Sequence, residues 1–146
     1  MSISFRTAFL RNVGQTSPEP DGFEVSRGEG IFLFDKEGNP FIDCISGIAV
    51  SSLGHGHPRI KDAIRKQLDL HLHTMVYGEH VQVPQVALAE RLAQLLPAEL
   101  DCTFFTSSGT EAVEGALKAA RKYTSRYEII ACRQAYHGST AGAESL

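Results

Sequence analysis

The stretch Phe104-Phe105-Thr106-Ser107-Ser108-Gly109-Thr110-Glu111-Ala112 decides the fold of this chain. The apolar run 102–105 is short enough to be a buried strand, and a helix is predicted from about Thr110 to Tyr123. Small residues separate the two, most of them with hydroxyls. The first N–H groups of a helix have no partner inside it, and the helix dipole adds positive charge there. This strand–turn–helix arrangement predicts an anion site, and we infer a phosphate group as its ligand.

Two readings of the turn remain open. Ser108 and Thr110 also fit a simpler role as helix N-caps, the commoner use of Ser and Thr at a helix start. The turn lacks the G-x-x-x-x-G-K-[ST] and G-x-G-x-x-G spacings of two common phosphate loops. Gly109 favours the anion site, because its missing β-carbon lets a ligand approach the backbone.

A second short run, 128–132, follows the helix and predicts another strand, because it is rich in apolar and β-branched residues. Strand, helix and strand form a right-handed βαβ unit with parallel strands. Ligands of open α/β sheets bind where the strands end. We therefore expect Tyr136 and His137, in the next loop, to lie near the Ser108-Gly109-Thr110 turn. A phosphate site beside an aromatic ring suits a flat, phosphorylated aromatic cofactor.

Ser108-Gly109-Thr110-Glu111-Ala112, followed by a helix, a strand and Tyr136-His137-Gly138, resembles the class III pyridoxal-phosphate-dependent aminotransferases. This family includes the acetylornithine, ornithine and 4-aminobutyrate aminotransferases, and often has Asn where Val113 stands. A second motif agrees, since a predicted hairpin ends in D-x-x-S-G-I at 43–48 and is followed by G-H-x-H-P at 54–58. The resemblance covers nearly all of residues 23–138.

The resemblance implies pyridoxal 5'-phosphate as the cofactor. It implies that Gly109 and Thr110, with Ser108 beside them, bind the cofactor phosphate. It also implies that Tyr136 stacks on the pyridine ring and that His137 belongs to the same cofactor site.

Two further residues are implied as substrate contacts. Val50 follows the G-I pair of the first motif, and Tyr77 is an aromatic residue in a predicted loop. Core packing is the alternative for Val50, and a half-buried loop position is the alternative for Tyr77.

The implied fold class is α/β, the N-terminal part of a fold type I pyridoxal-phosphate-dependent transferase. Residues 1–50 are expected to form an N-terminal arm and a β-hairpin of the small domain, with the hairpin turn at 36–40. Residues 51–146 are expected to begin an incomplete large domain with a mainly parallel sheet. Pro58 and Pro84 favour helix starts, and we expect helices at about 58–73 and 84–96.

The implied function is transfer of an amino group from an α- or ω-amino acid to a 2-oxo acid such as 2-oxoglutarate. The family's Schiff-base lysine and its aspartate for the pyridine nitrogen match no residue here and are expected beyond Leu146. The chain is therefore expected to be a fragment, inactive alone, of a parent that is a homodimer. The alternatives are another enzyme of the same family, namely an aminomutase or a decarboxylase, and a non-catalytic truncated product.

The composition is that of a globular protein, with 42% hydrophobic and 21% charged residues and a net charge of −3. We expect no nucleic-acid or membrane partner and a cytoplasmic location. Cys44, Cys102 and Cys132 lie in apolar contexts and are predicted to be buried free thiols. His55 and His57 are predicted to be turn and packing residues. The His-x-His pairs have no Cys or carboxylate at ligand spacing, so no metal site is expected.

Overall fold

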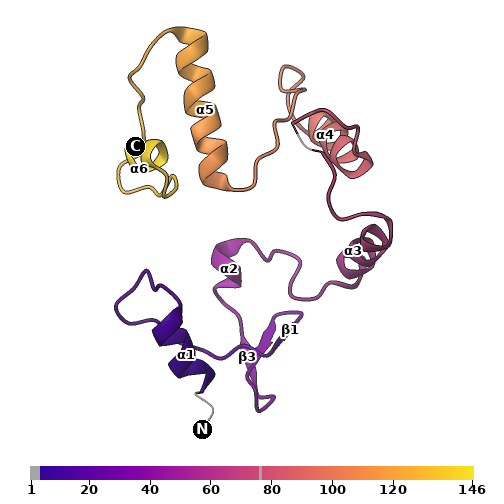
Figure 1. Ribbon diagram of the computed structural model, residues 1–146, viewed down its shortest axis with the longest axis vertical. Helices are drawn as coiled ribbons and strands as arrows, with labels where there is room; N and C mark the ends of the chain where they lie inside the picture. The colour runs from indigo at the N-terminus through magenta and orange to yellow at the C-terminus, as the bar shows by residue number, and fades with distance from the viewer. Residues whose placement is uncertain (1–3, 76) are drawn as a thin grey trace. The chain divides into compact units, whose positions relative to one another are not determined.

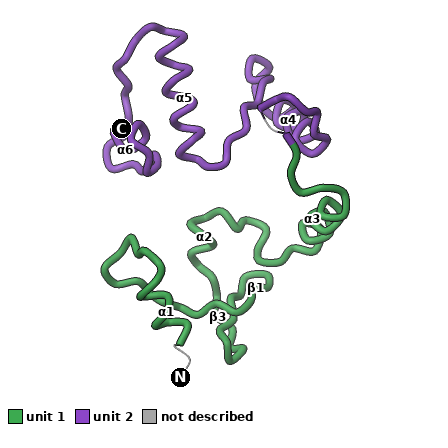
Figure 2. Tube along the Cα trace, in the orientation of Figure 1, with its two compact units in different colours: residues 1–74 green, residues 75–146 purple. Residues whose placement is uncertain are grey.

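A computed structural model of the chain describes residues 4–75 and 77–146 (Figure 1). The chain divides into two compact units, residues 1–74 and 75–146 (Figure 2). The assignment of residues 1–50 to a small domain and 51–146 to a large one stays a prediction. No helix within the described ranges is long and apolar enough to cross a membrane.

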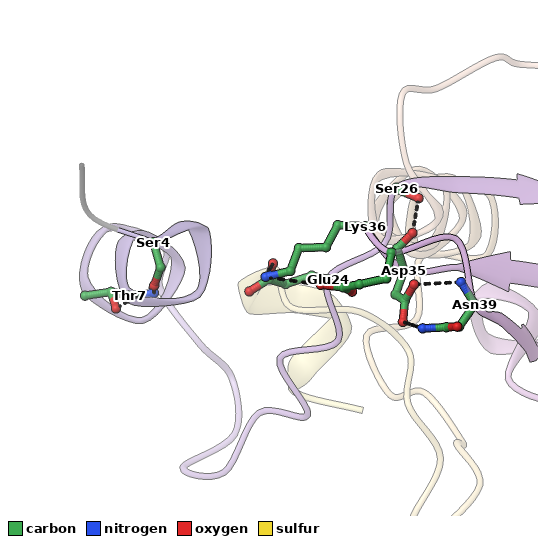
Figure 3. Close-up of polar contacts among 8 residues, drawn as sticks. Ser4, Thr7, Glu24, Ser26, Asp35, Lys36 and Asn39 are labelled. Atoms are coloured by element: carbon green, nitrogen blue, oxygen red, sulfur yellow. Dashed lines mark hydrogen bonds and ion pairs between the residues drawn. The ribbon is translucent and has the colours of Figure 1, made fainter. Parts of the chain in front are cut away.

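The first unit begins with helix α1 (Phe5–Asn12), which lies in the predicted N-terminal arm. Ser4 is its N-cap, and the Ser4 hydroxyl accepts a hydrogen bond from the Thr7 N–H at 3.2 Å. Both residues are drawn in Figure 3. This cap satisfies one of the N–H groups that a helix start leaves without a partner.

A three-stranded antiparallel sheet follows, with strands in the order β1 (Arg27–Glu29), β2 (Phe32–Phe34) and β3 (Pro40–Ile42). The hairpin of β2 and β3 was predicted and is confirmed, with Leu33 opposite Phe41. Strand β1 was not predicted, because its three residues are polar or flexible and carry no strand signal. This segment becomes a strand through its pairing with β2. The Arg27 guanidinium lies 3.4 Å from the centre of the Phe34 ring and adds a cation–π contact across this pair.

The hairpin loop is closed by the side chain of Asp35. Its carboxylate accepts from the Asn39 N–H at 2.8 Å and from Asn39 Nδ2 at 2.9 Å (Figure 3). The hydrogen bond from the Asn39 side chain is the main cause of the lowered pKa of Asp35. Gly38 is the one residue of this loop with a positive φ, +88°. Glycine therefore occupies the left-handed position, and Asn39 acts as a hydrogen-bond donor. Lys36 reaches Glu24 at 3.4 Å and links the loop to the segment before the sheet.

Element α2 (Ser46–Ala49) is a single turn with left-handed backbone. The φ angles of its four residues lie between 53° and 63°, and only Gly47 among them is a glycine. Left-handed backbone costs roughly 1–2 kcal/mol at a residue with a side chain. Contacts elsewhere must therefore stabilise this turn. The unit ends with helix α3 (Pro58–Leu70), which starts where predicted but stops three residues before His73.

The second unit contains helices α4 (Val83–Leu95), α5 (Gly109–Thr124) and α6 (Ala141–Glu144). Both α4 and α5 were predicted within two residues of their observed bounds. Helices α5 and α6 contact each other (Figure 1). The buried apolar side chains found among the described residues are Leu117 of α5 and Ala143 of α6, which are 7% and 1% exposed.

The predicted strands at 102–105 and 128–132 are not formed. Phe104 is 84% exposed and Ile130 is fully exposed, and neither run is paired with another strand of the described chain. A strand needs a neighbouring backbone to receive its hydrogen bonds, which an apolar run alone does not supply. The prediction of buried cysteines was wrong for the same reason, since Cys102 and Cys132 lie in these runs and are exposed free thiols, as is Cys44.

Candidate functional site

The start of α5 is fixed by reciprocal side-chain caps. Ser108 is the N-cap, and its hydroxyl accepts from the Glu111 N–H at 3.3 Å. The Glu111 carboxylate reaches back and accepts from the Ser107 N–H at 2.8 Å. This arrangement is close to a capping box, which satisfies two helix-start donors at once. The N-cap reading, one of the two left open for Ser108, is therefore confirmed.

Three further N–H groups at this turn are open to a ligand. Residues 4–75 and 77–146 provide no acceptor for the N–H groups of Ser108, Gly109 and Thr110. A β-carbon built at Gly109 meets nothing within 4 Å, so the backbone is accessible there. The Ser108 hydroxyl, while it accepts from Glu111, still has its own proton to donate. Together with the dipole of a 16-residue helix, these donors favour an anion.

The loop that follows residue 132 is held against this helix start. Thr110 Oγ1 lies 2.8 Å from Thr140 Oγ1 and accepts from the Thr140 N–H at 3.3 Å. Gly138 is buried, and a β-carbon there would come 2.5 Å from Thr110 Cβ. The two segments that the sequence placed at one site are thus in direct contact, through Thr110, Gly138 and Thr140.

Glu114 provides a second connection between the same segments, and it was not predicted. Its carboxylate accepts from the Gly142 N–H at 2.8 Å and from the Ala143 N–H at 3.3 Å. The Thr140 side chain is the largest cause of the lowered pKa of Glu114, followed by the Gly142 N–H. Glu114 is therefore ionised at neutral pH and caps α6 from the second turn of α5.

Tyr136 and His137 lie just before Gly138 in this loop. Tyr136 is 82% exposed, and its hydroxyl is 2.8 Å from Ser139 Oγ, so the ring is accessible to a ligand. His137 is half-buried, and its Nε2 atom is buried with no hydrogen-bond partner found in the described part of the chain. A buried nitrogen without a partner costs free energy that a bound ligand would recover.

Val50 and Tyr77 lie in different units and are both exposed. Val50 follows the left-handed turn and is 74% exposed in this chain. Tyr77 is 91% exposed in this chain, at a φ of +62°. No group of three or more His, Cys, Asp or Glu side chains suited to a metal ion was found among the residues described.

Residues 14–146 match the sequence model of the family described as Aminotransferase class-III. The chain belongs to the class III aminotransferases. Acetylornithine aminotransferase of Methanopyrus kandleri is 43% identical over 120 residues, which are 81% of this chain and 30% of that protein.

Solved structures agree with this family. Adenosylmethionine-8-amino-7-oxononanoate aminotransferase of Methanocaldococcus jannaschii has a TM-score of 0.88 at 30% identity, covering 96% of this chain and 34% of that one. Taurine:2-oxoglutarate aminotransferase of Bifidobacterium kashiwanohense, solved with PLP and glutamate, has a TM-score of 0.78 at 31% identity, over 92% of this chain and 30% of that one. The class III chain thus spans about a third of the length of these relatives and shares the fold of pyridoxal-phosphate-dependent aminotransferases over that part.

Family membership implies pyridoxal 5'-phosphate as the cofactor of this aminotransferase chain. The residues present fit that group. The unpaired N–H groups at the start of α5 suit a phosphate. The accessible ring of Tyr136, in the loop held against that helix start, suits an aromatic heterocycle.

Proposed function

We propose that this chain is the N-terminal part of an aminotransferase that moves an amino group from an α- or ω-amino acid to a 2-oxo acid such as 2-oxoglutarate. One observation carries the proposal. In a class III chain, the contact of Thr110 with Gly138 and Thr140 joins a helix start with unpaired N–H groups to a loop with an exposed aromatic ring.

The residues at the start of α5 would bind the cofactor phosphate. The N–H groups of Gly109 and Thr110, together with the Ser108 hydroxyl, supply uncharged donors at the positive end of the helix dipole. When bound, pyridoxal 5'-phosphate supplies an electron sink for bond breaking at the substrate carbon that carries the amine. The protein's part here is to hold the cofactor in a fixed orientation.

The loop residues would orient the cofactor ring. Tyr136 would stack on the ring, and the Tyr136–Ser139 hydrogen bond would limit its motion. His137 would place its unpartnered Nε2 atom at the cofactor or its surroundings. Exposed Val50 and Tyr77 would contact the amino-acid substrate.

We also propose where the lysine lies, how the two apolar runs are paired and what the complete enzyme is. The lysine that bonds the cofactor would lie outside these 146 residues, since Lys36 is in the hairpin loop and the other lysines lie on α3 and α5. The strands at 102–105 and 128–132 would pair within a mainly parallel sheet of the complete enzyme. That enzyme would be a cytoplasmic homodimer, and the 146-residue chain alone would be inactive.

The test uses the purified 146-residue chain incubated with pyridoxal 5'-phosphate, followed by absorbance, borohydride reduction and mass mapping. We expect reversible binding and no specific covalent adduct. A stoichiometric adduct on one lysine would contradict the assignment of that lysine to another part of the protein.

The complete protein is then assayed with 2-oxoglutarate and a panel of amino donors, namely N-acetylornithine, taurine and 4-aminobutyrate. Glutamate formation from one of them is the expected result. If the cofactor-loaded protein isomerises or decarboxylates its substrate and forms no glutamate, this result contradicts amino-group transfer. It would favour the aminomutase or decarboxylase alternative. A protein that never binds the cofactor would favour a non-catalytic product.

A further inference from the structure

The left-handed turn of α2 has little packing of its own. Ile48, at its centre, is 86% exposed, and Val50, just after it, is 74% exposed. Strained backbone that no core contact stabilises persists only where polar contacts determine its conformation, and it occurs most often at ligand sites. Residues Ser46–Ala49 therefore depend on polar contacts with neighbouring groups.

Asp43 holds the entrance to the turn. One carboxylate oxygen, Oδ1, accepts from the Ile45 N–H at 3.1 Å and from the Ser46 N–H at 2.7 Å. The side chain of Asp43 is only 8% exposed, so water competes weakly for these bonds. Asp43 therefore fixes the two residues at which the backbone changes hand.

His55 holds Asp43 in turn. His55 Nε2 lies 2.7 Å from the second carboxylate oxygen, Oδ2. The pKa of Asp43 is lowered, mainly by the hydrogen bond from the Ser46 N–H and then by the contact with His55 and the bond from the Ile45 N–H, so its carboxyl group is ionised. An ionised carboxylate only accepts hydrogen bonds, and His55 Nε2 is therefore the donor. Both oxygens of Asp43 are thus occupied by defined donors.

The backbone of His55 is itself anchored to Gly30, directly after strand β1. The N–H of Gly30 donates to the His55 carbonyl at 2.9 Å, and the His55 N–H donates to the Gly30 carbonyl at 2.7 Å. The neighbouring backbone is packed tightly, because a β-carbon at Gly28 would come 2.8 Å from the His55 ring. A continuous chain of contacts therefore runs from strand β1, through His55 and Asp43, to the left-handed turn.

We propose that Asp43 and His55 are positioning residues that hold the left-handed turn Ser46–Ala49 and so present Val50 to the amino-acid substrate. The role in substrate binding rests on the proposed aminotransferase function. The holding role does not, since it is a property of these contacts alone. Neither residue touches the cofactor in this assignment.

The holding role is tested by NMR on the 146-residue chain. The Cα and Cβ chemical shifts of Ser46, Ile48 and Ala49 depend on φ and ψ and change when left-handed backbone becomes extended or irregular. We expect left-handed shifts in the wild type and their loss in His55→Phe, which keeps a ring but has no donor. His73→Phe, at an exposed histidine of the same unit, is the matched control and should leave these shifts unchanged. Left-handed shifts that survive in His55→Phe would overturn the holding role.

A conservative variant separates this role from general misfolding. His55→Gln keeps an N–H donor for Asp43 and is expected to restore the left-handed shifts. If His55→Phe does not fold, His55→Gln decides the matter, and a glutamine variant that folds without the left-handed shifts would overturn the donor role.

The substrate role is tested on the complete, cofactor-loaded enzyme. We expect His55→Phe to raise the KM for the amino donor about tenfold, with kcat and cofactor affinity within about twofold of wild type, because only substrate positioning is lost. An unchanged KM in a variant that has lost the turn would overturn the substrate role. A wild-type enzyme that transfers no amino group from any donor would refute the proposed function, while the chemical shifts would still decide the holding role.

Discussion

The backbone of Gly138 lies directly against the side chain of Thr110, so that a β-carbon at Gly138 would come 2.5 Å from Thr110 Cβ. This contact, with the Thr110–Thr140 hydrogen bond beside it, joins the aromatic loop to the start of α5. The orientation of Tyr136 relative to the candidate phosphate site therefore depends on a residue without a side chain.

Gly138→Ala is expected to weaken cofactor binding at least tenfold. The added methyl group overlaps Thr110, and overpacking of this kind costs about 1–3 kcal/mol. The φ of +132° at Gly138 adds strain for any residue with a β-carbon. The measurement is a titration of pyridoxal 5'-phosphate followed by absorbance. Gly115→Ala, on α5 where a β-carbon meets nothing within 4 Å, is the control and should bind as tightly as wild type.

Ser108→Asp is expected to separate helix capping from anion binding. Aspartate caps helices as well as serine does, so the thermal midpoint should stay near that of wild type. Its negative charge would repel a phosphate at the same turn, and we expect cofactor affinity to fall at least tenfold. Affinity equal to wild type in Ser108→Asp would mean that this turn is a capped helix start and nothing more. Circular dichroism and cofactor titration on the same samples give the two readouts.

Tyr136→Ala is expected to weaken cofactor binding by about tenfold, since aromatic stacking contributes about 0.5–1.5 kcal/mol beyond the buried area. Tyr136→Phe keeps the ring and should retain most of the affinity, although it loses the bond to Ser139. Tyr123→Ala on α5, where Tyr123 is 93% exposed, is the matched control. Equal losses in the alanine and phenylalanine variants would assign the effect to the hydroxyl rather than to the ring.

The contact between α5 and α6 is expected to weaken in acid. The pKa of Glu114 is lowered in the folded chain from its ordinary value of 4.5, mainly by the Thr140 side chain. The ionised carboxylate therefore stabilises the fold above pH 4.5, and this contribution is lost as the pH falls through the lower folded pKa. The amide proton shifts of Gly142 and Ala143 should titrate with a midpoint below that value. Glu114→Gln should abolish the titration, and a titration that persists in this variant would assign it to another group.

Elements with local signals were predictable from the sequence. Gly38 marks the hairpin turn, and Pro58 and Pro84 lie at the starts of two helices. The prediction of strands at 102–105 and 128–132 was wrong, because a strand requires a partner strand. The sequence of the run itself does not report whether that partner is present. The left-handed turn was missed because three of its four residues carry side chains that ordinarily exclude this backbone.

The motifs of the candidate site were predictable from the sequence, and the side-chain contacts that hold these motifs in place were not. The Ser108-Gly109-Thr110 turn and the Tyr136-His137 pair were found from their spacing and from the family resemblance. Glu114 was missed because its backbone partners lie 28 and 29 residues away. Asp43 and His55 were recognised as parts of a motif, but their contact over 12 residues has no periodic signal.

The donors at the start of α5 belong largely to the main chain. Substitution by alanine at Gly109 or Thr110 leaves the peptide N–H in place, so an alanine scan does not test these donors. An amide-to-ester exchange, which substitutes oxygen for the N–H, removes one donor at a time without changing the side chain. The same property lets the site tolerate sequence drift, because evolution must preserve a backbone path there rather than a particular set of side chains.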